Sequence, residues 1–180
     1  MQMNCWGDFM LDVIYNRRSC RKFINKDVEI EKIEEVINAG LYAANGMGYQ
    51  YGIVIAITAK DKVDKLRKLN AKILGNENID PFYGANCVLL VAVKKWRNAA
   101  YDGACMIENM MLEATNQNLG SCWIHRAKEE LESPDAKSIF KDLNINLDEY
   151  EGVGHVILGY KDNNEIAPKK INDNRIFWLK

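Results

Sequence analysis

The segment between residues 99 and 120, AAYDGACMIENMMLEATNQNLG, limits the possible folds of this chain more than any other feature. Read as a helix from Tyr101 to Gln117, it carries apolar side chains around nearly its whole circumference: Ala104, Met106, Ile107, Met110, Met111, Leu112 and Ala114. A helix that is apolar on every face must be buried. In a domain of 180 residues we expect a central helix, covered either by a sheet on one side or by another subunit on the other. A plain core helix is the alternative to an interface.

The rest of the chain intermixes amphipathic helical patterns with short apolar runs. Helices are expected at residues 8–18, 29–44, 60–74 and 127–143, and strands at 53–57, 87–93, 121–124 and 153–160. This order lacks a regular βαβ alternation, which predicts an α+β fold built in layers. No internal repeat, low-complexity tract or linker divides the chain, so residues 1–180 are expected to form a single domain.

Charge and cysteine content narrow the possible functions. The 24 Lys and Arg residues balance 25 Asp and Glu residues, which argues against the domain-wide basic face of a nucleic-acid-binding protein. The five cysteines are scattered, form no CxxC pair, and are expected to be free thiols in a reducing compartment. No apolar window has the length of a membrane span. We therefore expect a soluble, cytoplasmic protein that binds neither membrane nor nucleic acid.

Known catalytic and metal-binding patterns are missing from the sequence. His125 and His155 have no His or Cys partner at a ligand spacing, so no metal site is expected. Gly46 and Gly48 precede a strand and lack the third glycine of a dinucleotide-binding fingerprint. Cys20 lies between arginines but has no nearby base or second cysteine, which argues against a nucleophilic role.

The stretch NRRSCRKF, residues 16–23, contains three arginines and one lysine within eight residues. Three interpretations are open: a phosphate-binding loop, a nucleic-acid patch, or a solvated basic turn. The near-neutral charge of the whole chain makes this loop a local feature. Taken alone, the loop does not decide between a phosphate site and an ordinary exposed turn.

Four segments taken together carry more information than any one of them. A helix leads into RRSCR, a Gly-rich NGMGYQ precedes a strand, DGACMIENMMLEA runs into LGSCWIHRA, and HVILGYKDNNEIAPKK follows near the end of the chain. In this order and spacing they resemble the nitroreductase family of FMN-dependent NAD(P)H oxidoreductases, in particular its short members with GMG in the flavin loop. The resemblance covers about Phe9 to Lys170.

The resemblance implies a fold and an assembly. Members of the family have a three-layer α/β/α fold with a central mixed, mainly antiparallel sheet. They form intertwined homodimers with two flavin sites at the interface. The apolar helix described above suits such an interface.

The resemblance also implies a set of cofactor-binding residues. Arg17 and Ser19 match positions that hold the FMN phosphate, Arg18 belongs to the same loop, and Arg21 matches the position at the pyrimidine edge of the flavin. There, a cation stabilises the negative charge that develops when N5 accepts a hydride. The full set expected to bind the cofactor is Arg17, Arg18, Ser19, Arg21, Gly48, Gln50, Ile124, His125, Arg126, Lys169 and Lys170.

Within this set, the segment Ile124–Arg126 matches the one that approaches flavin N5 and O4 through backbone N–H groups. Lys169 and Lys170 match a late basic pair that reaches the phosphate. No side chain is expected to act as a catalytic acid or base, because N5 carries the chemistry. Trp123 is expected in the core, and Asn109 is expected to satisfy buried backbone instead of touching a ligand.

Two departures from the family pattern concern the flavin loop and the chain end. Where many members have a Pro-Ser pair and an asparagine, this chain has Ala44-Asn45 and Gly48, and it keeps Gln50. The usual arginine near the end is a lysine here, which keeps the charge but loses the planar fork of a guanidinium. We therefore expect the flavin loop to form fewer of the family's hydrogen bonds to the flavin, and the lysine to bind the phosphate more weakly than an arginine would.

The resemblance implies an enzyme in which NAD(P)H delivers hydride to FMN and departs, and an oxidised aromatic acceptor such as a nitroarene or quinone replaces it. One alternative is a relative with different flavin chemistry, such as reductive dehalogenation or flavin cleavage. Another is a non-catalytic flavoprotein that stores or senses FMN or passes electrons to protein partners. The sequence does not identify the physiological substrate or the preferred nicotinamide.

Overall fold

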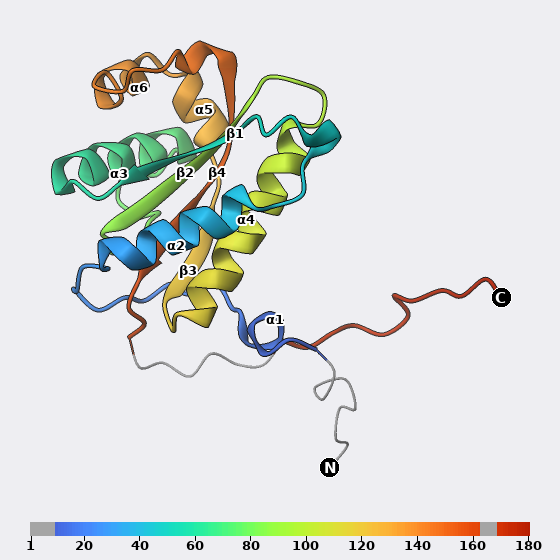
Figure 1. Cartoon of the computed structure of the whole chain (residues 1–180). Helices are drawn as coiled ribbons and strands as arrows, with labels where there is room; N and C mark the ends of the chain where they lie inside the picture. Colours follow the sequence, from blue (N-terminus) through green and yellow to red (C-terminus); the bar gives the residue numbers. More distant parts are fainter. Residues whose placement is uncertain (1–9, 163–168) are drawn as a thin grey trace.

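The computed structural model describes residues 10–162 and 169–180 of the chain. Its helices and strands follow one another without regular alternation (Figure 1). Their bounds are α1 (Asp12–Asn16), α2 (Ile30–Leu41), η1 (Gly46–Gly48), β1 (Gly52–Ile57), α3 (Lys60–Leu74), β2 (Cys87–Lys94), α4 (Ala99–Asn116), β3 (Gly120–Ile124), α5 (Ala127–Glu132), α6 (Pro134–Ile139), η2 (Leu147–Glu149) and β4 (Tyr150–Gly159). No helix in these ranges is long and apolar enough to cross a membrane.

The four strands form one sheet in the order β1-β2-β4-β3, and each neighbouring pair is antiparallel. A single parallel bridge joins Ser19 to Ser121 at the outer side of β3. The mainly antiparallel sheet predicted from the family resemblance is thus confirmed. The two central strands, β2 and β4, pair along their length with one bulge between Val91 and Ala92.

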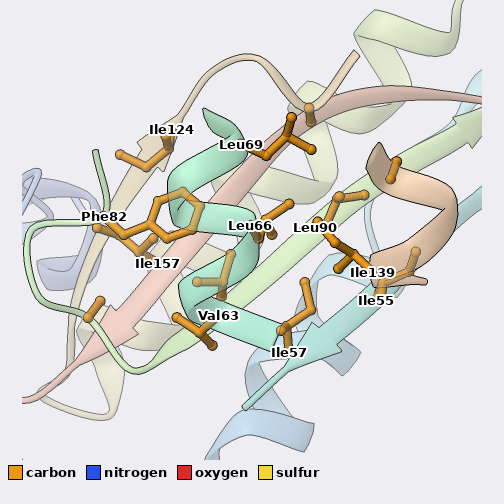
Figure 2. Close-up of a cluster of buried hydrophobic side chains, with 14 of the residues drawn as sticks. Ile55, Ile57, Val63, Leu66, Leu69, Phe82, Leu90, Ile124, Ile139 and Ile157 are labelled. Atoms are coloured by element: carbon orange, nitrogen blue, oxygen red, sulfur yellow. The ribbon is translucent and has the colours of Figure 1, made fainter. Parts of the chain in front are cut away.

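Both faces of the sheet are covered, which gives the three predicted layers. Strand β2 is buried on both sides, which explains why it reads as an unbroken apolar run in the sequence. Val88, Leu90 and Ala92 belong to a cluster with α3, α5 and α6, which Figure 2 shows around Leu66 and Phe82. Leu89 and Val91 of β2 face the other way and belong to a second cluster with α2 and α4. Figure 1 shows α3, α5 and α6 on one face of the sheet and α2 and α4 on the opposite face.

Helix α4 is buried on most of its circumference but not on all of it. Met106, Ile107 and Met110 lie in the core, as the sequence predicts. Tyr101, by contrast, is 73% exposed, and Cys105 and Glu108 are exposed as well. These positions follow one another at helical spacing and form a stripe along α4. This stripe is uncovered within a single chain, so the burial predicted for α4 would be complete only with a second subunit.

Two predicted helices differ from the structure in extent. The region expected to be helical from 127 to 143 is divided into α5 and α6 at Ser133, whose Oγ accepts a hydrogen bond from the Asp135 N–H at 3.3 Å. Pro134 occupies the first turn of α6, where proline is favoured. The helix expected at residues 8–18 extends only from Asp12 to Asn16, and Asp8 lies outside the described residues.

Helix α4 packs against β4 so closely that only glycine fits at position 103. A Cβ atom added to Gly103 would lie 2.4 Å from Cγ2 of Val153 and 2.7 Å from its Cβ. Alanine is favoured over glycine in a helix by about 1 kcal/mol. Overpacking a core costs about 1–3 kcal/mol, so the steric effect wins.

We expect Gly103→Ala to lower the free energy of unfolding by about 1–2 kcal/mol, measured by urea denaturation at a fixed protein concentration. Adding Val153→Ala to this variant should recover part of the loss, because the clash is removed. Lys68→Ala, at an exposed position of α3, is the control and should change the stability by less than about 0.5 kcal/mol. A Gly103→Ala variant as stable as the wild type would contradict the packing argument.

Candidate functional site

The basic loop, residues 17–22, lies along the free edge of the sheet. The Cys20 N–H donates to the Ser121 carbonyl at 2.8 Å, and Phe23 forms an antiparallel bridge with Lys161. Strand β3 is an edge strand whose outer backbone groups need partners, and the loop supplies some of them. The loop is thereby held against β3 and not left as a free turn.

Three of the predicted cofactor-binding side chains influence the pKa of the Cys122 thiol on β3. Burial raises the pKa of this thiol, whereas the positive charge of Arg21, a hydrogen bond with Ser19 and the charge of Arg17 act in the opposite direction. The positive charge of both arginines and the hydroxyl of Ser19 are therefore felt at this strand. This combination suits an anion such as a phosphate.

The arginines of the loop differ in the partners they already have. Arg17 forms an ion pair with Glu108 of α4, with Nε and Oε1 3.3 Å apart, and its side chain is 17% exposed. The Arg18 guanidinium folds back to donate to the carbonyls of Tyr15 and Arg17, at 2.7 Å each. Arg21 is exposed, with its guanidinium carbon 6.0 Å from the centre of the Tyr83 ring. Arg17 and Arg21 are thus better placed than Arg18 to meet a ligand.

Cys20, in the middle of the loop, has a structural environment. It is 4% exposed, and its Sγ donates to the Lys22 carbonyl at 3.1 Å. It also fills the space left by the missing side chain of Gly120. The thiol therefore packs the loop against β3, in agreement with the argument against a nucleophilic role.

The segment from Ile124 to Arg126 leads from β3 into α5 and turns sharply at Arg126, whose φ is 80°. The carbonyl of Ile124 lies 3.3 Å from Nδ1 of His155, and the carbonyl of His125 accepts from Nδ2 of Asn70 at 2.9 Å. Both carbonyls therefore point toward buried side chains.

In a trans peptide the N–H points opposite to the carbonyl of the same plane. No cis peptide occurs in the described residues, so the N–H groups of His125 and Arg126 point away from Asn70 and His155. Neither N–H donates to a backbone carbonyl within residues 10–162 and 169–180. The segment thus presents two adjacent, unused backbone donors directly after β3, the strand against which the basic loop is held.

Gly48 and Gln50 lie in another part of the molecule. They belong to the region of η1, which is anchored at the start of α4 because the Gly46 N–H donates to Oδ1 of Asp102 at 2.9 Å. Figure 1 shows η1 beside the N-terminal end of α4, whereas β3 begins beyond its other end. Within one chain, therefore, the fold does not bring these two residues to the basic loop.

Lys169 and Lys170 are exposed in the segment that follows the undescribed residues 163–168. A role for them at a phosphate stays a prediction from the family resemblance.

The prediction for Asn109 is confirmed, since its Nδ2 donates to the Ala39 carbonyl at 3.1 Å. Trp123 is partly buried against the cluster on the α4 side of the sheet. The indole Nε1 of Trp123 and the Oγ of Ser121 are buried without a hydrogen-bond partner among the described residues. Both atoms belong to the strand that carries the site.

Sequence reasoning missed Asn70 and Glu130, which are fully buried beneath Ile124–Arg126 and hydrogen-bonded to each other. It also considered His155 only as a metal ligand, and rejected that role. A signal was available for Asn70, because it lies next to Leu69 on the apolar face of α3 that contains Val63 and Leu66. A polar residue at such a position needs a specific partner.

The described residues contain no cluster of three or more His, Cys, Asp or Glu side chains suited to a metal ion. A cavity of about 190 Å³ is lined by β1, the start of α3 and the residues around Ile139. It contains none of the predicted cofactor-binding residues, and β1 is the sheet edge opposite to β3. The candidate site is therefore the outer side of β3, defined by the basic loop and the two N–H donors of His125 and Arg126.

Solved structures of similar fold cover almost the whole chain. A nitroreductase from Bacteroides fragilis with bound FMN is 26% identical, with a TM-score of 0.85 and coverage of 94% of this chain and 97% of that one. A nitroreductase with bound FMN from Desulfitobacterium hafniense is 21% identical, with a TM-score of 0.82 and coverage of 94% and 97%. A putative NADH oxidase from Clostridium acetobutylicum is 24% identical, with a TM-score of 0.75 and coverage of 94% and 99%.

No curated protein is similar enough in sequence to count as a relative. The family model described as the nitroreductase family, however, matches residues 14–160. This match spans the basic loop, the whole sheet and the segment from Ile124 to Arg126. Together with the three-layer fold, it shows that the chain belongs to the nitroreductase family.

Proposed function

We propose that this protein is an FMN-dependent oxidoreductase that transfers hydride from NAD(P)H to nitroaromatic or quinone-type acceptors in a ping-pong reaction. The observation that carries the proposal is the pair of unused N–H donors at His125 and Arg126, which directly follow β3, the strand against which the loop with Arg17 and Arg21 is held. The similarity to the Bacteroides fragilis nitroreductase with bound FMN supports it.

The residues present fit a flavin mononucleotide in charge and in hydrogen-bonding capacity. Arg17 offers a planar fork for a phosphate, and Ser19 offers a hydroxyl beside it. Glu108 is 51% exposed, so solvent already screens its pairing with Arg17, and a phosphate can compete for the guanidinium. The loop provides positive charge for one phosphate, which favours FMN over FAD.

The donors of the second segment suit the ring of the cofactor. When bound, FMN supplies N5 as the atom that accepts hydride from NAD(P)H and passes it to the acceptor. The N–H groups of His125 and Arg126 would hold the N5 and O4 edge, and Arg21 would stabilise negative charge at the N1 and O2 edge. The protein needs no catalytic base, because its task is to place two ring systems in contact.

We further propose that two copies of the chain form a homodimer in which Gly48 and Gln50 of one copy complete the flavin site of the other. Several large apolar side chains support this assembly because they are uncovered in the single chain. Leu11 is 70% exposed, Ile30 56%, Tyr42 90% and Tyr101 73%. An apolar surface of this kind is unusual for a soluble monomer.

The purified protein should be yellow and release FMN, not FAD, as shown by its absorption spectrum and by mass spectrometry of the released cofactor. It should oxidise NADH or NADPH, and the rate should rise when a nitroarene or quinone is added. A protein that binds no added FMN would contradict the proposal. Bound FMN without oxidation of either nicotinamide would point instead to a flavoprotein for storage, sensing or electron transfer.

Arg17→Ala should weaken FMN binding by about 2–3 kcal/mol, which is roughly a 30- to 150-fold rise in Kd, because it removes a charge-assisted hydrogen-bonded pair. Arg21→Ala should retain more FMN but lower the reduction potential of the bound flavin. Fluorescence titration and redox titration measure the two effects. Lys22→Ala removes an exposed charge from the same loop and is the control for non-specific electrostatics. An unchanged potential in Arg21→Ala would remove its proposed electronic role.

Light scattering should show a dimer at low micromolar concentration. Tyr101→Glu, which puts a charge on the exposed stripe of α4, should shift the protein toward monomer and lower its FMN content, because each site would lose the residues of the second copy. Lys68→Glu on the outer side of α3 is the matched control and should remain dimeric. A wild-type monomer that holds stoichiometric FMN would disprove the shared site.

A further inference from the structure

Three polar side chains with no exposed surface lie directly beneath the segment from Ile124 to Arg126. Asn70 comes from α3, Glu130 from α5 and His155 from β4, and each is 0% exposed. Burying such groups is costly unless each is hydrogen-bonded. Their position under the two proposed flavin-facing donors therefore calls for an explanation beyond core packing.

The first part of this network joins Asn70 to both sides of the segment. Nε of Arg126 donates to Oδ1 of Asn70 at 2.9 Å, and Nδ2 of Asn70 donates to the His125 carbonyl at 2.9 Å. The same Nδ2 also donates to Oε1 of Glu130. Because the oxygen of Asn70 meets a donor and its nitrogen meets two acceptors, only one orientation of the amide satisfies all three contacts.

The second part returns to the segment through His155. Oε2 of Glu130 lies 2.7 Å from Nε2 of His155, and Nδ1 of His155 lies 3.3 Å from the Ile124 carbonyl. A carbonyl can only accept, so Nδ1 carries a proton. Neither Oε2 of Glu130 nor Nε2 of His155 has a hydrogen-bond partner by geometry among the described residues, so this approach is a close electrostatic contact and not an aligned hydrogen bond. The ring of Phe82, with its centre 5.7 Å from that of His155, packs beside the imidazole.

The hydrogen bonds, together with the contact between Glu130 and His155, thus form a closed network that begins and ends on three consecutive residues. It holds two successive carbonyls, those of Ile124 and His125, and the side chain of Arg126. Holding a carbonyl fixes the direction of the N–H in the same planar peptide. The network therefore determines where the donors of His125 and Arg126 point.

We propose that Asn70, Glu130 and His155 are positioning residues, which tune the flavin by orienting the N–H groups of His125 and Arg126 toward its N5 and O4 edge. This inference rests on the proposed function. The role depends on hydrogen bonds and not on the charge of the carboxylate. That distinction can be tested, because one conservative substitution keeps the network and another breaks it.

Glu130→Gln should preserve the network. The glutamine oxygen can still accept from Asn70, and its NH₂ can donate to Nε2 of His155, while Nδ1 still donates to Ile124. Asn70→Asp has nearly the same shape but replaces the donor by an oxygen that faces the His125 carbonyl and Glu130. Asn70→Ala removes the same donor without adding charge, and it serves as the second variant should Asn70→Asp fail to fold.

Three measurements on folded protein test the idea: the Kd for FMN, the reduction potential of the bound flavin, and the amide NMR signals of His125 and Arg126 without flavin. The Asn70 variants should bind FMN about tenfold more weakly or worse, as expected when at least one hydrogen bond is lost. Their potential should fall, and the two amide signals should shift or broaden. Glu130→Gln should stay within about threefold of the wild-type Kd, with the potential and amide signals of the wild type.

Asn70 variants that match the wild type in Kd and potential would overturn the inference while leaving the proposed function intact. A Glu130→Gln variant as impaired as Asn70→Ala would also overturn it, since the negative charge would then matter and not the network. Wild-type protein that binds no FMN would overturn the proposed function, and with it any role of the network in tuning a flavin. The amide signals would still show whether Asn70 orients the segment.

Discussion

The candidate site depends on the position of β3 at the edge of the sheet. One side of β3 pairs with β4, and the other side is left to non-strand segments. The basic loop takes up part of this free side through Cys20 and Ser19. The peptides that follow β3 have no such partner, and their N–H groups remain available. If β3 lay in the middle of the sheet, these N–H groups would be hydrogen-bonded to a neighbouring strand.

The helices and strands were largely predictable because each is formed by local sequence. Strand β2 is an unbroken apolar run since both its faces are covered, and α3 shows its core face directly in the spacing of its apolar residues. The break at Ser133 and Pro134 was readable from the same sequence, as a cap followed by a first-turn proline. The exposed stripe of α4 was not predicted, because the apolar residues elsewhere around the helix indicated burial on every face, whereas Tyr101, Cys105 and Glu108 are left uncovered within one chain.

The candidate site was predictable only in part, for a different reason. Arg17, Ser19 and Arg21 are close in sequence, so one local motif is enough to predict them together, and the loop that contains them lies against β3. Asn70, Glu130 and His155 come from three separate elements, and no local pattern predicts that they meet. The same holds for Gly48 and Gln50, which lie away from the loop within a single chain. Residues that act through tertiary or quaternary contacts leave little trace in the order of the sequence.

The ion pair between Arg17 and Glu108 has a consequence for the protein without cofactor. In a loop with three arginines and a lysine, the positive charges repel one another. Without a counter-ion, such a loop would become ordered only when an anion bound to it. Glu108 acts as a built-in counter-ion for Arg17 in the protein without ligand. In the proposed complex with FMN, binding would exchange one anion for another, so less of the binding energy would be spent on ordering the chain, and the net gain in electrostatic attraction would be correspondingly smaller.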